Sequence, residues 1–236
     1  MPTDVGVIAN RTRNGGGACG WSRAWVVALG ARFFNTSVVN QYFTTQLGEC
    51  SWNKSMLNMG GSTPFQIDAN FGLPAGLVEV LVQSHEWVKL PSAAPGNGST
   101  RCGNSSSGAQ GGSWTTGSNG RDLAAAFTGD LDKAPLIRLL PALPPQWAAT
   151  GGSGSVKGTV TRGGFVIDLS WDQNARIRNA NITSRLGGPV CVTAGQSTIG
   201  SAAEGNGTGI AIAEKGSGAF VCMQTTPGNV YSITPQ

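Results

Sequence analysis

The chain of 236 residues is long enough for one large domain or two small ones, each with a core of ordinary size. Only 12% of the residues are charged and 36 are glycine, so the surface must consist largely of Ser, Thr, Asn and Gly, which is common in extracellular proteins and unusual in cytosolic enzymes. The net charge of +4 comes from Lys and Arg residues scattered without a cluster, which argues against nucleic acid as a partner.

The first pattern in chain order is helical. Large apolar residues recur every four positions in GWSRAWVVALGARFF (20–34), and the i, i+3, i+4 spacing returns in SVVNQYFTTQL (37–47). Ser22 and Ser37 are available as N-caps. We therefore expect two helices with a short connection.

One carboxylate, Asp68, stands in the otherwise uncharged stretch PFQIDANFG (64–72). We expect this stretch to be a loop that leads into a third helix, LPAGLVEVLVQSHEW (73–87), with Pro74 near its first turn. Backbone N–H groups and the macrodipole at a helix N-terminus stabilise an ionised carboxylate, so Asp68 can serve as a cap or as a chemical group. The single histidine, His85, is expected near the helix C-terminus, and without a G-x-S-x-G elbow it predicts no nucleophilic triad.

The second half of the chain has a different pattern. Residues 91–133 are rich in Gly, Ser and Asn and predict a surface loop or insertion. From 134 onward the period changes to two, and alternation over 154–184, with RGG and DQN as turns, predicts an antiparallel meander. Further short runs complete a small sandwich-like domain; they are GPVCVT (188–193), GIAIAE (209–214), GAFVCMQ (218–224) and NVYSIT (229–234).

The five cysteines show no C-x-x-C spacing, and with a single histidine they predict no metal site. Cys191 and Cys222 both lie in short β-like runs, which favours a disulfide between neighbouring strands. The sequence alone does not fix the pairing, and the odd count leaves one thiol over.

Seven Asn-x-Ser/Thr sites, more than chance placement would give, predict a glycosylated secretory protein; they begin at Asn10, Asn35, Asn53, Asn97, Asn104, Asn181 and Asn206. The N-terminus has neither the basic nor the apolar region of a signal peptide, and the longest apolar run, residues 24–31, is too short to span a bilayer. We therefore expect a piece of a longer secreted protein, with no membrane partner.

Four stretches form a specific set when taken in order; they are GWSRAW (20–25), PFQIDANFG (64–72) with AGLVEVLVQSHE (75–86) after it, LIRLLPALPPQW (136–147) and GSVKGTVTRGGFVIDLSW (154–171). Together they resemble the C-terminal part of the family 95 glycoside hydrolases, the inverting α-L-fucosidases, of the secreted fungal type. The resemblance implies an α+β chain. It predicts the last helices of an (α/α)6 catalytic barrel in residues 1–90, the loop or insertion in 91–133, and a C-terminal antiparallel β-sandwich-like domain in 134–236.

The same resemblance implies a function. The substrate would be an oligosaccharide with a terminal α-linked L-fucose, 1,2-linked, or its hydroxylated analogue L-galactose, and no cofactor is implied. The family's general acid is a glutamate on an earlier barrel segment, and the water is held by asparagines that also come from an earlier segment. The 236 residues alone are therefore expected to be inactive. The alternative is a secreted non-catalytic module that binds carbohydrate or serves in assembly.

The resemblance also implies site residues. Asp68 matches the aspartate that polarises the water-holding asparagines, which makes it the predicted catalytic residue, with a helix cap as the alternative. Gln66 and Asn70 flank it and either bind sugar hydroxyls or tie the loop together. Trp21 either lines the sugar-binding cleft or packs in the core with Trp25. The metal prediction is none.

Overall fold

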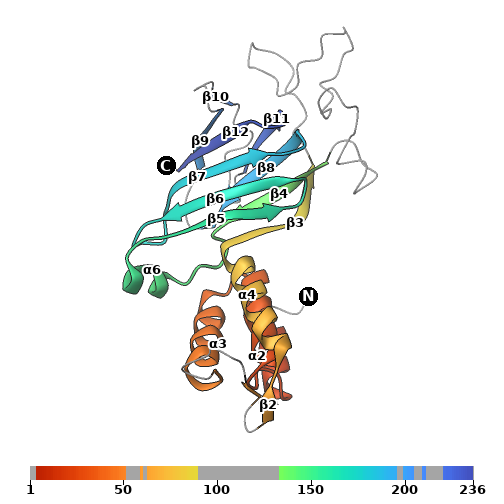
Figure 1. Ribbon diagram of the computed structural model, residues 1–236, viewed down its shortest axis with the longest axis vertical. Helices are drawn as coiled ribbons and strands as arrows, with labels where there is room; N and C mark the ends of the chain where they lie inside the picture. Colours follow the sequence, from red (N-terminus) through yellow and green to blue (C-terminus); the bar gives the residue numbers. More distant parts are fainter. Residues whose placement is uncertain are drawn as a thin grey trace. The chain divides into compact units, whose positions relative to one another are not determined.

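The computed structural model describes residues 4–51, 59–60, 63–89, 133–195, 199–204, 209–210 and 220–235. Most of the predicted loop at 91–133, together with Cys102, lies outside the described residues. The chain divides into two compact units, one made of Met1–Val82 and Leu140–Gly152, the other of Gln83–Leu139 and Ser153–Gln236 (Figure 1). The first unit is mainly helical and the second is built from strands, so the fold class is α+β.

The helices of the first unit are α1 (Asp4–Arg13), α2 (Trp21–Arg32), α3 (Thr36–Glu49), α4 (Ile67–Leu81) and α6 (Pro145–Gly151). A short antiparallel pair, β1 (Met59–Gly60) and β2 (Thr63–Phe65), precedes α4. The two helices predicted from the first pattern are confirmed as α2 and α3. None of the described helices is both long and apolar enough to cross a membrane.

The predicted N-caps of α2 and α3 were wrong. Asn35 caps α3, because its side-chain oxygen accepts a hydrogen bond from the Val38 N–H at 3.1 Å. Gly20 precedes α2 without a side-chain cap, and Ser22 lies inside the helix, where its hydroxyl accepts from the Gly17 N–H at 3.0 Å. Ser37 lies inside the first turn of α3.

Helices α2 and α4 pack closely because small residues meet at their contact. A Cβ atom added to Gly72 would lie 3.2 Å from the Ala24 side chain, and one added to Gly76 would lie 3.1 Å from the Val27 side chain. Ala24 and Val27 are fully or almost fully buried. The two glycines are four residues apart and so share one face of α4, which lets the backbones approach.

Helix α4 begins and ends earlier than predicted. It starts at Ile67, so Asp68 lies in its first turn and not in a loop, and Pro74 lies inside the helix. It stops at Leu81 because a remote segment replaces its last turn. The Leu140 N–H donates to the Leu81 carbonyl at 2.8 Å, and the Ala142 N–H donates to the Val80 carbonyl at 3.3 Å.

The residues after α4 form a strand, β3 (Val82–Lys89), so the prediction that His85 lies near a helix C-terminus was wrong. The stretch VQSHEWVK has the β-branched and aromatic residues of a strand, whereas its apolar residues had suggested helical spacing. His85 therefore lies in the second unit, in a sheet.

The other strands of the second unit are β4 (Lys133–Leu139), β5 (Gly154–Thr161), β6 (Phe165–Trp171), β7 (Ile177–Ser184), β8 (Gly188–Ala194), β9 (Ile199–Glu204), β10 (Gly209–Ile210), β11 (Val221–Thr225) and β12 (Val230–Pro235). One sheet has the strand order β10-β9-β12-β7-β6-β5, the other β11-β8-β4-β3. The predicted meander is confirmed as β5-β6-β7. The β4–β8 pair is parallel, unlike the antiparallel pairing predicted throughout.

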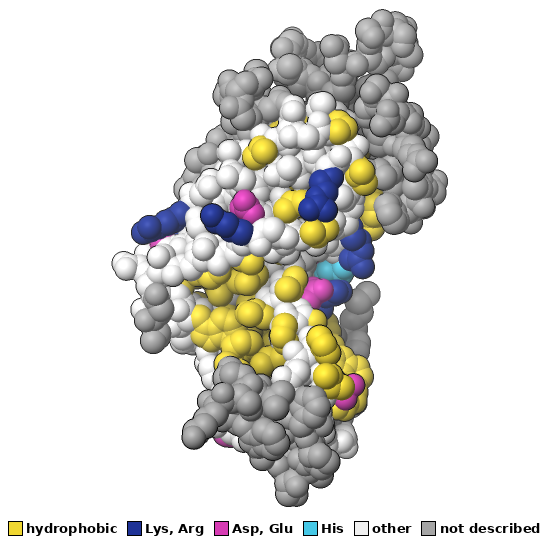
Figure 2. All heavy atoms as spheres, in the orientation of Figure 1, with side chains coloured by type: hydrophobic (Ala, Val, Ile, Leu, Met, Phe, Trp, Pro, Cys, Tyr) yellow, Lys and Arg dark blue, Asp and Glu magenta, His cyan; other side chains and the backbone are white. Residues whose placement is uncertain are grey.

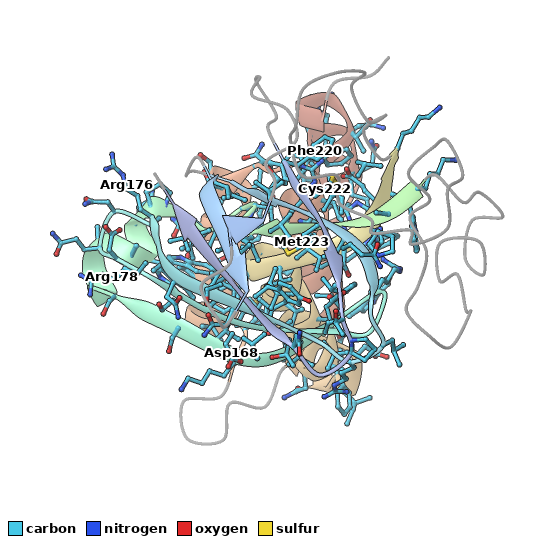
Figure 3. The ribbon with its side chains drawn as sticks, turned by 90° about the horizontal axis from the view of Figure 1, so that it is seen from above. Asp168, Arg176, Arg178, Phe220, Cys222 and Met223 are labelled. Atoms are coloured by element: carbon cyan, nitrogen blue, oxygen red, sulfur yellow. A yellow bond between two sulfur atoms is a disulfide. The ribbon has the colours of Figure 1, made fainter. Side chains whose placement is uncertain are left out.

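Alternation sets the buried face of β6 in the six-stranded sheet, whereas β8 and β11 of the four-stranded sheet are buried at consecutive positions. In β6, Phe165, Ile167 and Leu169 are buried while the residues between them are partly exposed. Figure 3 shows Cys222 and Met223 of β11 inside the second unit, whereas Arg176 and Arg178 project from its surface. Both sheets of the second unit thus contribute buried apolar side chains.

Two disulfides are present in the described residues. Cys191 and Cys222 lie directly opposite each other on β8 and β11 and are bonded, which confirms the predicted bridge. The second disulfide joins Cys19, just before α2, to Cys50 at the end of α3. Sequence reasoning missed it, because neither cysteine lies in a strand-like run.

Candidate active site

Asp68 is exposed in the first turn of α4. The residue at the N-cap position is Gln66, and no side-chain cap hydrogen bond is formed there. Asp68 therefore does not act as the N-cap, which was the alternative to a chemical role. Its carboxylate lies where the helix macrodipole favours negative charge.

Gln66 faces the start of α2. Its side-chain oxygen accepts a hydrogen bond from the Trp21 N–H at 3.1 Å. The same oxygen lies against Gly20, because a Cβ atom added there would come within 2.0 Å of it. Gln66 thus ties the first turn of α4 to the first turn of α2.

Trp21 is 47% exposed and does not pack in the core. Its ring stacks on that of Trp25, with centroids 5.3 Å apart and planes 16° from parallel. The Arg11 guanidinium lies 4.1 Å from the centroid of the Trp25 ring. A stack of one cation and two indoles therefore ends in an accessible aromatic surface.

Asn70 lies away from this surface. It is two positions from Asp68, which is roughly 200° around a helix, so the two side chains leave α4 on nearly opposite sides. Asn70 lines a mostly apolar cavity of about 350 Å³ between α3 and α4; the other lining residues are Phe43, Leu47, Ser51, Ala69, Leu73, Pro74 and Leu77. The structure therefore brings Asp68, Gln66 and Trp21 to one end of the α2–α4 pair, and Asn70 to another surface.

Sequence reasoning missed Gln46, which lies in α3 and is fully buried. Its side-chain oxygen accepts from the Gly20 N–H at 3.1 Å, one residue before the bond that Gln66 makes. Arg11 was also missed as a member of the ring stack, whereas the pairing of Trp21 with Trp25 had been considered as core packing. The only signal in the sequence was a glutamine placed among apolar positions of a predicted helix.

A second group of titratable residues lies in the sheet unit. The Arg138 guanidinium binds the Glu86 carboxylate with two hydrogen bonds, of 3.2 and 2.6 Å. His85 Nε2 is 3.6 Å from the same carboxylate. Within the described residues, no three His, Cys, Asp or Glu side chains are grouped to hold a metal ion. This group is a partly exposed ion pair between neighbouring strands.

Comparison with known proteins finds a family model that matches residues in each of the two units. Residues 7–81 match the family model described as the glycosyl hydrolase family 95 catalytic domain, and residues 133–233 match the glycoside hydrolase family 95 C-terminal domain. The chain belongs to glycoside hydrolase family 95. In this family 95 chain the catalytic-domain match ends where α4 ends, and the C-terminal match begins where β4 begins. Asp68, Gln66, Asn70 and Trp21 all lie in the catalytic-domain match, whereas His85 lies in neither.

The relatives of this family 95 chain include two curated fungal proteins. It is 27% identical over 168 residues to the "Probable alpha-fucosidase A" of Aspergillus oryzae, which is 70% of this chain and 17% of that protein. It is 26% identical over 155 residues to the "Probable alpha-fucosidase A" of Aspergillus niger, which is 66% of this chain and 14% of that protein. The family 95 chain thus spans less than a fifth of the length of these relatives.

Proposed function

We propose that this chain supplies part of the active site and the C-terminal domain of an inverting α-L-fucosidase that removes terminal α-1,2-linked L-fucose from oligosaccharides. The family and the names of the two relatives support the reaction class. The observation that carries the proposal is the exposed Asp68 carboxylate in a helix turn that Gln66 ties to the backbone N–H of Trp21, whose ring is also exposed.

The proposal extends to the architecture. Helices α1–α4 are the last helices of an (α/α)6 barrel, and the two sheets form a β-sandwich. Exposed hydrophobic side chains over the helices of the first unit (Figure 2) support the first assignment, because Ile67 and Phe71 on α4 are 53% and 72% exposed. Two disulfides and the glycosylation sites support a secreted glycoprotein.

Inverting hydrolysis needs an acid that protonates the leaving oxygen and a base that activates water across the ring, with the two roughly 6.5–9.5 Å apart. In this proposal the Asp68 carboxylate polarises asparagine side chains that hold the water, and the acid is a glutamate; both partners lie on an earlier segment. The Trp21 ring packs against the C–H face of the sugar. Sugar binding by Gln66 and Asn70 stays a prediction.

The test uses the protein at its natural length, with Asp68→Asn and the matched control Asp168→Asn. Asp168 lies on β6, and an asparagine there can still accept the hydrogen bond from the Gly158 N–H. We expect Asp68→Asn to lower kcat for 2′-fucosyllactose by about 10²–10⁴-fold with folding intact, the usual contribution of acid–base catalysis, while the control keeps its rate. Near-normal turnover of Asp68→Asn, or α-fucose as the first product in NMR, would refute the proposal.

A second expectation concerns these 236 residues expressed alone. We expect no release of fucose from 2′-fucosyllactose, because the proposed acid and the water-holding amides come from another segment. Measurable turnover would show that the acid lies within these residues. Binding of the glycan without turnover, unaffected by Asp68→Asn, would favour a carbohydrate-binding module instead.

A further inference from the structure

Three consecutive residues at the start of α2 are each tied to a different part of the first unit. Two of the ties are hydrogen bonds from backbone N–H groups to glutamine side chains, and one is a disulfide. The three pairs are Cys19 with Cys50, Gly20 with Gln46 and Trp21 with Gln66.

The two N–H groups belong to a helix N-terminus, where backbone donors have no partner within the helix. Gly20 is buried, and Gln46 is fully buried, so the loss of this acceptor would leave an unsatisfied donor away from water. α2 has no side-chain cap of its own. Gln46 in α3 and Gln66, the residue before α4, therefore take the place of the missing cap.

We propose that Gln66 and Gln46 are positioning residues, which hold the first turn of α2 so that the Trp21 ring keeps a fixed place at the same end of the α2–α4 pair as Asp68. This inference rests on the function proposed above. It gives Gln66 a role different from the sugar contact predicted from its position in the sequence.

The geometry around Gly20 supports this role for Gln66. Gly20 has a φ of 85°, a backbone conformation that favours glycine, and the Gln66 oxygen occupies the place where a Cβ atom would stand. The oxygen is thus seated against the backbone of α2 and not directed at solvent. Gln66 is also the residue two positions before Asp68, so one side chain fixes both helix starts.

The ring stack completes the arrangement. Hydrogen bonding fixes the backbone of Trp21, and stacking on Trp25 fixes the plane of its ring. The Arg11 guanidinium also contacts the Trp25 ring. A ring that is fixed in this way loses little conformational freedom when a sugar packs against it. The affinity for the sugar therefore depends on the hydrogen bonds and the stacking that fix the ring.

The test compares Gln66→Met, Gln66→Glu and the control Gln41→Met in the protein at its natural length. Methionine keeps the length of the side chain but has no strong acceptor, whereas glutamate keeps the acceptor and loses the amide donors. Gln41 is an exposed glutamine of α3. Two quantities are measured: backbone amide exchange over residues 17–25, and KM and kcat for 2′-fucosyllactose.

We expect Gln66→Met to speed exchange at the Trp21 amide by about fivefold, the usual worth of one hydrogen bond, and to raise KM by a similar factor with a smaller change in kcat. Gln41→Met should leave both near wild type, and Gln66→Glu, which keeps the acceptor, should keep the slow exchange of the Trp21 amide. Unchanged Trp21 exchange in Gln66→Met would overturn the inference. So would equally fast Trp21 exchange in Gln66→Glu and Gln66→Met, since a role that depends on the amide donors, such as a sugar contact, would be lost in both variants. If the wild type has no fucosidase activity, the proposed function is overturned instead. Amide exchange needs no substrate, so it still tests whether Gln66 holds the Trp21 backbone.

Discussion

At the scale of single residues, Asp172 shows how one carboxylate closes a turn. Its Oδ1 accepts hydrogen bonds from the Arg176 N–H at 2.9 Å and the Asn174 N–H at 2.8 Å, between β6 and β7. The bond from the Arg176 N–H, with smaller contributions from the Asn174 N–H and the charges of Arg178 and Arg176, lowers the pKa of Asp172 below its ordinary value of 3.8. The ionised form therefore stabilises the turn.

This shift predicts a pH dependence. A carboxylate with a lowered folded-state pKa contributes stability that is fully present above the ordinary value of 3.8 and is lost as the pH falls through the lower folded-state pKa. We expect Asp172→Asn to lower the Tm slightly at neutral pH, and the difference from wild type to vanish below that window. Thermal melts across the acid range measure it. A Tm difference that persists unchanged at the lowest pH would contradict this account.

At the scale of elements, the contact of α2 with α4 depends on two glycines of α4 and small residues of α2. We expect Gly76→Leu to lower the free energy of unfolding by about 1–3 kcal/mol, because the added side chain must displace Val27 or separate the helices. Gly48→Leu is the matched control, since an added Cβ at Gly48 in α3 meets nothing within 4 Å. It should be neutral or stabilising, because leucine has the better helix propensity. Denaturant melts give the free energy of unfolding of both variants. Equal changes in that free energy would show that the α2–α4 contact is not tight.

The elements also show what a sequence can reveal. Regular apolar spacing was enough to predict α2, α3 and the meander β5-β6-β7, because these elements bury one face and pair with chain neighbours. The end of α4 was not predictable, because it depends on hydrogen bonds from Leu140 and Ala142, some sixty positions away. The same holds for Gln46 and Gln66, whose local sequences do not indicate that both face Gly20. The catalytic role proposed for Asp68 comes from the family resemblance and not from spacing.

At the scale of the whole molecule, the exposed apolar side chains of the first unit predict association. Ile67, Phe71 and Val78 lie along α4, and patches of this kind favour contact with other apolar surfaces. We expect the 236 residues expressed alone to self-associate in sedimentation velocity experiments, and Ile67→Ser with Phe71→Ser to reduce this. Val160→Ser, at a 60% exposed position in β5, serves as the control and should change little. A monodisperse monomer that melts cooperatively would count against the prediction.

The chain passes between the two units three times, after Val82, Leu139 and Gly152. During synthesis, the first unit therefore lacks the hydrogen bond from the Trp147 indole to Asn40 until residues 140–152 leave the ribosome. Strand β4 is made before them but pairs in parallel with β8, which is made later. The first unit can therefore be completed only after residue 152 is made, and the second, which depends on slow non-local pairing, only after β8. A ribosome that stalls near residue 140 would hold two incomplete units at once.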